Sequence, residues 1–189
     1  MKNRGVQLLT CLLSAAIFAA AGFVSGTGAS VKTETVGYTV EQADASGIST
    51  TYNSVDALLA ALKKAKGDGR GYGYSCVRLN GYSGNVYVVT SKIFTGFEPN
   101  ENFSDTAFVY AQGTDGKVRR IGEIPACGSS CLVSLQDGAL IVAKHHDFTK
   151  YTVSSDGSKL IATTYKEEGN EAAFKKACKA PEINFTLAR

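Results

Sequence analysis

The stretch CLVSLQDGALIVAKHHDFTKYTVSSDGSKLIATTYK, residues 131–166, decides the fold of this chain. It consists of short apolar runs separated by Asp137-Gly138, by the loop at residues 145–149 and by Asp156-Gly157. An Asp-Gly pair between apolar runs favours a type I′ hairpin turn, because both central residues need a positive φ, which Gly adopts freely and Asp tolerates. The stretch therefore predicts a β-meander of four short antiparallel strands.

The segment before this stretch has a similar outline. Residues 86–89 and 107–111 are apolar, Asp115-Gly116 marks a turn, and residues 118–124 form a further candidate strand. The Asp-Gly turns at 115 and 156 lie 41 residues apart, a spacing typical of four-stranded propeller blades. We predict a mainly β fold, an antiparallel meander of about eight strands in two tandem four-stranded, blade-like repeats. Two blades cannot close a propeller ring, so an open sheet or a sandwich is expected.

Two helices are predicted outside the strands. Apolar residues recur at helical spacing from Val55 to Ala65, after a capping Asn53 or Ser54. This pattern predicts an amphipathic N-terminal helix at 54–66 that packs on the β region. A short C-terminal helix is predicted at 170–179, ending before Pro181. The glycine-dense segment at 67–74 follows a helix, whereas a phosphate-binding loop precedes one, so we interpret it as a linker.

The first 29 residues have the pattern of a secretory signal peptide. Lys2 and Arg4 precede an apolar run at 6–24, and small residues follow it at 27–29. The alternative is a membrane helix, because the run is nearly long enough to cross a bilayer. With the signal peptide at 1–29, we divide the remainder into an N-terminal segment with helix and linker, 30–71, and a β-meander domain with the C-terminal helix, 72–189. Secretion to the extracellular space is the predicted location.

The charge of the mature chain argues against two classes of partner. Removal of residues 1–29 leaves 18 basic and 17 acidic residues, a net charge of +1. A nearly neutral domain has no electrostatic attraction for nucleic acid or for an anionic membrane. The expected partner is therefore an extracellular protein or a glycan.

Four cysteines remain after export, and an even number in an oxidising compartment favours two disulfides. Of the three possible pairings we favour Cys127–Cys131, separated by Gly-Ser-Ser, together with Cys76–Cys178. A redox-active pair and a zinc site are the alternatives. The three-residue spacer and the lack of a histidine at ligand spacing beside the cysteines disfavour both.

Few residues indicate chemistry. The only histidines, His145 and His146, precede Asp147 in a predicted loop, and adjacent strand residues point to opposite faces, so the rings are not expected to converge on one ion or substrate. We interpret them as solvated. Glu98, Glu101 and the nearby residue 105 lack the order of a calcium loop and are interpreted as a solvated acidic loop. No catalytic residue, metal site or cofactor is predicted.

Surface recognition is the function that the composition favours. Five aromatic residues near predicted turns are expected to be exposed and to form a ligand patch: Tyr72, Tyr74, Tyr82, Phe97 and Phe103. The sequence therefore predicts a secreted, disulfide-stabilised, non-enzymatic module that binds a protein or glycan through the loops of the first repeat. The alternative function is a small secreted hydrolase that uses His145 or His146.

Overall fold

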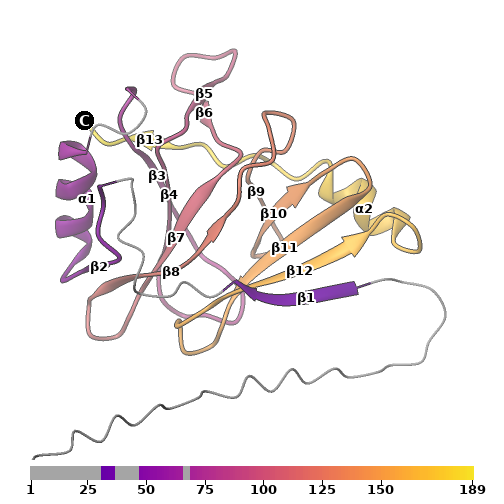
Figure 1. The fold of residues 1–189 in the computed structure, drawn as a ribbon, viewed down its shortest axis with the longest axis horizontal. Helices are drawn as coiled ribbons and strands as arrows, with labels where there is room; N and C mark the ends of the chain where they lie inside the picture. Colours follow the sequence, from indigo (N-terminus) through magenta and orange to yellow (C-terminus); the bar gives the residue numbers. More distant parts are fainter. Residues whose placement is uncertain (1–30, 37–46, 66–68) are drawn as a thin grey trace, which may run out of the picture.

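The computed structural model describes residues 31–36, 47–65 and 69–189, so the predicted signal peptide lies outside the described residues. Two antiparallel sheets pack face to face, helix α1 (Val55–Lys64) covers the outer face of one sheet, and helix α2 (Glu171–Ala177) covers the outer face of the other (Figure 1). The chain is thus mainly β, as predicted. No helix within the described ranges is long and apolar enough to cross a bilayer.

The sheets are built from strands in the following order. The six-stranded sheet is β13-β3-β4-β7-β8-β2, the five-stranded sheet is β1-β12-β11-β10-β9, and β5-β6 form a separate hairpin. The strand bounds are β1 Val31–Val36, β2 Thr51–Tyr52, β3 Gly73–Val77, β4 Val86–Thr90, β5 Phe94–Thr95, β6 Asn102–Phe103, β7 Ala107–Gln112, β8 Val118–Ile124, β9 Ser134–Gln136, β10 Ala139–Ala143, β11 Asp147–Val153, β12 Leu160–Lys166 and β13 Thr186–Leu187.

Each sheet contains one four-stranded antiparallel meander, β3-β4-β7-β8 in one and β9-β10-β11-β12 in the other. The loop around the histidines is shorter than predicted, because Asp147 and the two residues after it already belong to β11. The two meanders lie in separate layers and form a sandwich, so each strand can bury one face against the opposite sheet.

The two Asp-Gly turns of the second meander differ in geometry. Asp137 and Gly138 have φ values of 49° and 65°, which fits the predicted type I′ turn. At the later turn only Gly157 has a positive φ, of 71°, and its N–H donates to Ser154 O at 2.8 Å. The prediction of a type I′ turn is wrong here. The carboxylate of Asp156 accepts hydrogen bonds from Ser154 Oγ and from the Ser158 N–H, which stabilises a longer turn.

The central strands are buried on both faces. All five residues of β4 are buried: Val86 and Val88 face the other sheet, whereas Tyr87 and Val89 face α1. Strand β10 follows the same rule, with alternate residues directed towards the sheet interface and towards α2. The apolar runs of β4 and β10 are not interrupted by polar residues, because the opposite sheet covers one face of each strand and a helix covers the other.

Helix α1 begins at a side-chain cap. Ser54 Oγ accepts the Ala57 N–H at 3.2 Å, and the helix ends where Ala65 becomes extended. Leu58 and Leu62 are completely buried against the outer face of the six-stranded sheet. Each contributes about 1.5–3 kcal/mol of hydrophobic stabilisation. Tyr72 is also completely buried in this layer, so the prediction that it is exposed is wrong.

The arrangement of layers contradicts one predicted disulfide. Cys76 on β3 lies opposite Tyr87 on β4, and the side chain of Tyr87 faces α1, so Cys76 is on that same face of the sheet. Cys178, in contrast, lies at the end of α2. Both sheets lie between these two cysteines, and all four described cysteines are free thiols. Cys127 and Cys131 are neighbours, since Cys131 Sγ lies 3.5 Å from Cys127 O and Cys127 Sγ lies 3.6 Å from Cys131 O.

Candidate functional site

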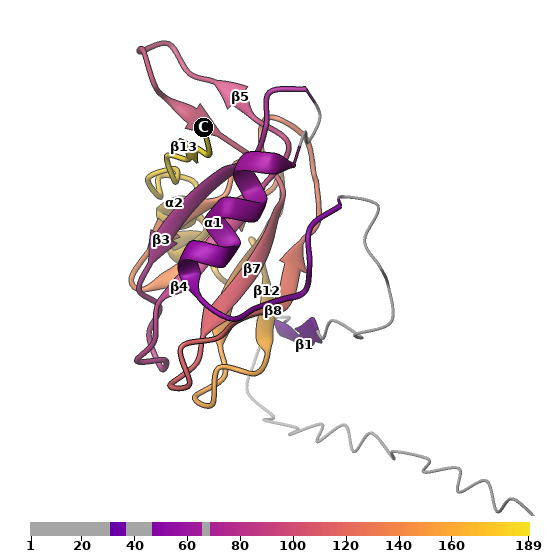
Figure 2. The ribbon, with the colours of Figure 1, turned by 90° about the vertical axis from the view of Figure 1, so that its left-hand side faces the viewer.

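Three turns from both sheets meet at one end of the sandwich. They connect β3 to β4 (residues 78–85), β7 to β8 (113–117) and β11 to β12 (154–159), and Figure 2 shows them side by side at the lower end of the molecule. Together they enclose a cleft of about 670 Å³, which we call the turn-end cleft. Four other cavities in the described part of the chain are smaller, at about 160–410 Å³.

Tyr82 holds the three turns together. Its hydroxyl donates to Gln112 O at 2.6 Å, and burial raises its pKa, so it remains a donor at neutral pH. The ring lies against Gly84 and Gly157. A Cβ on Gly84 would lie 2.6 Å from the ring, and one on Gly157 would lie 2.5 Å from it, so neither position accepts a side chain without displacement. Tyr82 therefore sets the shape of the cleft from within its wall.

Two carboxylates of the cleft are held in their charged form. Arg119 binds Asp115 through two contacts, Nη2 to Oδ2 at 2.5 Å and Nη1 to Oδ1 at 3.0 Å. This pairing lowers the pKa of Asp115 to about 2. Hydrogen bonds from Ser154 and Ser158 lower the pKa of Asp156 to about 2 as well. At neutral pH both groups accept hydrogen bonds and neither carries a proton to donate.

The cleft also offers hydrogen-bond donors. Arg78 is exposed and donates from one guanidinium nitrogen to Ser83 O, so its other N–H groups are available to a bound molecule. Asn85 Nδ2 donates to Gln112 Oε1 at 2.9 Å, which orients both amides in the wall. The sequence-based search did not find Arg78 or Arg119. Their only signal was their position next to turns.

The five predicted ligand residues do not form one patch. Tyr82 lies at the turn-end cleft, whereas Phe97 and Phe103 belong to the β5-β6 hairpin, at the opposite end of the molecule (Figure 1). Tyr74 is half-buried in a groove beside α1 and the last residues of the chain, and Tyr72 is in the core. Residues close in sequence were separated because the strands between them span the length of the sheet.

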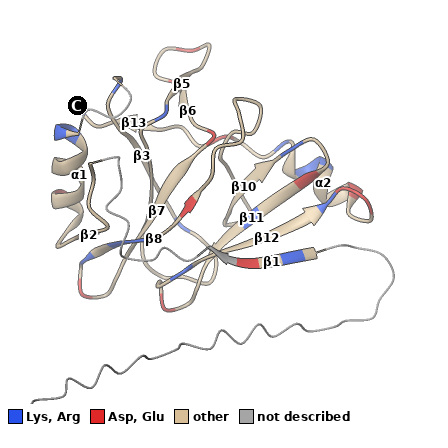
Figure 3. Ribbon diagram, in the orientation of Figure 1, with Lys and Arg blue, Asp and Glu red and all other residues tan. Residues whose placement is uncertain are grey.

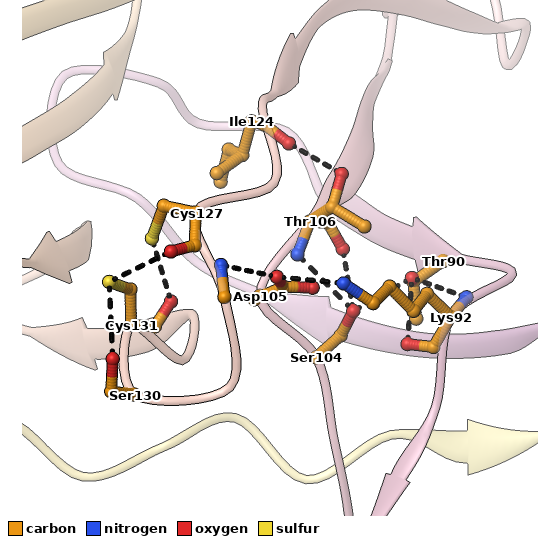
Figure 4. A network of polar contacts seen from close by, with 10 residues as sticks. Thr90, Lys92, Ser104, Asp105, Thr106, Ile124, Cys127, Ser130 and Cys131 are labelled. Carbon is orange, nitrogen blue, oxygen red and sulfur yellow. Dashed lines mark hydrogen bonds and ion pairs between the residues drawn. The ribbon is translucent and has the colours of Figure 1, made fainter.

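The predicted acidic loop contains a buried carboxylate. Asp105 is completely buried, its Oδ2 contacts Lys92 Nζ at 2.9 Å and accepts the Gly128 N–H at 2.7 Å, and its Oδ1 has no hydrogen-bond partner within the described residues (Figure 4). The interpretation of this residue as solvated is wrong. Asp105 ties the β6-β7 connection to the loop that carries Cys127 and Cys131.

The thiol of Cys127 is not activated. Burial and the neighbouring Cys131 raise the pKa of Cys127 to about 12, so it carries a proton at neutral pH. Figure 4 shows the two sulfur atoms close to each other's carbonyl groups. A nucleophilic role would need a thiolate, which this environment disfavours.

The histidines lie elsewhere. His145 lines a pocket of about 160 Å³ with Cys131 and Cys178, and His146 Nδ1 lies 3.2 Å from Glu167 Oε2, with a side chain that is 86% exposed. Neither ring has a hydrogen bond to a serine hydroxyl among the described residues. The same part of the chain contains no group of three side chains that could hold a metal ion.

No protein-family model, no curated protein and no solved structure matches this chain. The turn-end cleft combines a volume of about 670 Å³, two carboxylates that stay ionised and an arginine with free donors. It is the candidate functional site.

Proposed function

We propose that this protein is a secreted, non-enzymatic binding module whose turn-end cleft holds a glycan. The single observation that carries the proposal is the cleft itself, which hydrogen-bonding side chains from three turns surround. The proposed export follows from the pattern of residues 1–29.

The chemistry of the cleft favours a glycan over a protein segment. A protein interface normally has an apolar centre that an aromatic or aliphatic side chain fills. The turn-end cleft instead presents the guanidinium of Arg78, the amides of Asn85 and Gln112 and the carboxylate of Asp156. Sugar hydroxyl groups both donate and accept, so they can match donors and acceptors placed at fixed positions. The ionised carboxylates accept from hydroxyl groups while Arg78 donates.

The same groups argue for binding rather than hydrolysis. Glycoside hydrolysis needs one protonated and one ionised carboxyl group on either side of the bond. Asp115 and Asp156 both have a pKa of about 2, so neither supplies the acid at neutral pH. A hydrolase based on His145 or His146 has less support, because both rings are exposed and have no hydroxyl partner in the described structure.

A Cys127–Cys131 disulfide is part of the proposal, and Cys76–Cys178 is not. Each sulfur atom already lies within 3.6 Å of the other residue's carbonyl oxygen. Closing a loop of this length removes denatured-state entropy equivalent to about 2 kcal/mol. The bond would stabilise the loop that Asp105 already holds.

A glycan array tests the proposed function. The secreted wild-type protein, Arg78→Ala and the control Arg189→Ala, which removes the same charge from the end of the chain, are applied to an array of neutral and acidic oligosaccharides. We expect the wild type and the control to bind the same glycans. Arg78→Ala should bind them about tenfold or more weakly, because a hydrogen bond to a charged group contributes about 1.5–3 kcal/mol.

Two results would contradict the proposal. One is a wild-type protein that binds no glycan on the array. The other is a glycan that binds Arg78→Ala as tightly as the wild type, since its site would then lie away from the cleft. Titration calorimetry with the strongest glycan measures the ratio of dissociation constants, and circular dichroism verifies that each variant is folded.

A further inference from the structure

Phe97 is the most exposed large apolar side chain of the described structure, with a relative exposure of 106%. It lies at the tip of the β5-β6 hairpin, which projects from the body of the molecule in both views (Figures 1 and 2). An isolated apolar residue on a flat surface needs no explanation. A phenylalanine on a projecting tip is different when the tip has a fixed conformation, because it can then enter a pocket without first being ordered.

The conformation of the tip is set by hydrogen bonds. The Gly96 N–H donates to Glu101 O at 2.8 Å, and the Glu98 N–H donates to Glu101 Oε2 at 3.1 Å. The Glu101 side chain also packs directly on Gly96, leaving no room for a Cβ there. Phe97 is therefore presented on an ordered tip that also carries the acidic residues Glu98 and Glu101.

The base of the hairpin is held on both sides. Arg70 Nη1 donates to Thr95 Oγ1 at 2.9 Å, and the Asn102 N–H donates to Asn184 Oδ1 at 2.9 Å. These contacts connect the hairpin to segments before and after it in the chain. The hairpin therefore projects from the body in a fixed position, and its tip can enter a pocket on another molecule.

The molecule also carries a pocket with matching chemistry. A cavity of about 360 Å³ lies between α2 and the outer face of the five-stranded sheet. Its apolar wall includes Ile141 and the stacked rings of Phe148 and Tyr165, whose centroids are 4.9 Å apart. A cavity of about 150 Å³ is enough to accept benzene. A phenylalanine ring therefore fits.

The charges around this pocket complement those of the hairpin. Lys150 and Lys176 line it; Lys176 Nζ is paired with Asp137 Oδ2 at 2.6 Å, whereas Lys150 has no ion-pair partner within the described residues. Glu98, next to Phe97, likewise has no cationic partner there. Figure 3 shows acidic residues at the hairpin tip and basic residues on α2.

We infer that the protein associates head to tail with a second copy of itself. Phe97 of one copy enters the pocket beside α2 of the next, where its ring contacts the Phe148–Tyr165 stack and Glu98 faces Lys150. The β5-β6 hairpin and α2, which borders the pocket, lie on separate parts of the molecule (Figure 1), so each contact leaves one hairpin and one pocket free. Such heterologous contacts produce open chains or closed rings.

The contact is small and the association is weak. One hairpin tip covers less than the roughly 1,200–2,000 Å² of a stable interface, so assembly depends on protein concentration. The three turns that form the turn-end cleft lie at the other end of the molecule from the hairpin (Figure 1), and none of the residues that line the cleft lines the pocket beside α2. A linear assembly therefore displays several clefts, and its avidity for a repeating glycan exceeds that of one copy. The association itself does not depend on the proposed glycan binding.

Sedimentation velocity from micromolar to millimolar concentration tests the inference on the full chain as an expression host secretes it. We expect the weight-average mass of the wild type to rise with concentration and that of Phe97→Ser to remain monomeric. The control is Ala60→Ser, which changes an exposed apolar residue of α1, the helix that covers the six-stranded sheet and not the five-stranded sheet that carries the pocket. It should associate like the wild type.

A mixing experiment tests the polarity of the contact. Lys150→Glu keeps the hairpin and loses the pocket charge, whereas Phe97→Ser keeps the pocket. Neither variant should associate alone, but the mixture should form heterodimers, because the intact hairpin of one meets the intact pocket of the other. The double variant Glu98→Lys with Lys150→Glu should recover association.

The inference is overturned if the wild type stays monomeric at millimolar concentration, if Phe97→Ser associates like the wild type, or if the mixture stays monomeric. Circular dichroism of each variant identifies any loss of fold. All the substituted side chains are on the surface or half-buried, so the folded state is expected to persist.

Discussion

Replacement of Asp105 tests how the two halves of the sandwich are joined. Asp105→Ala removes a completely buried carboxylate that makes two contacts, with Lys92 Nζ at 2.9 Å and with the Gly128 N–H at 2.7 Å. Removing one partner of a buried ion pair lowers the free energy of unfolding by about 3–5 kcal/mol. The Lys92 side chain is 42% exposed and can return to water, so the cost should lie near the lower end, about 3 kcal/mol.

Asp105→Asn should cost less, about 1–2 kcal/mol. An amide oxygen in the place of Oδ2 still accepts from the Gly128 N–H and from Lys92 Nζ, while the negative charge that pairs with Lys92 is lost. The amide nitrogen would take the place of Oδ1, a buried position that makes no hydrogen bond within the described residues. Asparagine therefore recovers part of the stability and not all of it.

Urea unfolding followed by far-ultraviolet circular dichroism measures these differences, because the chain has no tryptophan to serve as a fluorescent probe. Glu98→Ala, an exposed carboxylate from the same region, is the control and should change the unfolding free energy by no more than about 0.5 kcal/mol. The rate at which a thiol reagent labels Cys127 gives a second readout, since the loop loses its Gly128 anchor. A loss below about 1 kcal/mol for Asp105→Ala, with unchanged labelling, would refute the reasoning.

Three further perturbations address the cleft and the thiols. Gly84→Ala places a Cβ 2.6 Å from the Tyr82 ring and should lower the unfolding free energy by about 1–3 kcal/mol, measured in urea; an unchanged midpoint would mean that the turn can move aside. Asp115 has a lower pKa in the folded state than its ordinary 3.8, so its stabilising contribution is complete above about pH 4 and is lost as pH falls through about 2. Asp115→Asn should remove that part of the acid dependence in unfolding curves at several pH values, and identical curves for both proteins would contradict it. In a buffer of oxidised and reduced glutathione, Cys127 and Cys131 should lose two hydrogen atoms to glutathione disulfide and form one bond; peptide mapping that finds both thiols intact would contradict this.

Local patterns were sufficient wherever a residue and its neighbours in the chain determine the conformation. The strands of both meanders follow apolar runs, and the turn at Asp137-Gly138 follows from the φ values that those two residues accept. The turn at Asp156 was misjudged, although its cause is also local. The side chain of Asp156 bonds to Ser154 and Ser158, and this competes with the two-residue turn.

The candidate site could be predicted only in part. Tyr82 was identified from its place beside a turn, but its role in the wall depends on Gln112 at the end of β7 and on Gly157 in the turn after β11. The burial of Asp105 depends in the same way on Gly128, 23 residues further along the chain. Composition near a turn does not show which turns will meet.

The sequence by itself determined the mainly β character of the chain and the tight turn at Asp137-Gly138, because φ preferences and the periodicity of apolar residues act over a few residues. Only the tertiary structure decided which side chains meet. It placed Cys76 and Cys178 on opposite sides of two sheets and gathered Arg78, Tyr82 and Asp156 at one cleft. Those relations follow from how the two meanders stack, and stacking depends on contacts between residues far apart in the chain.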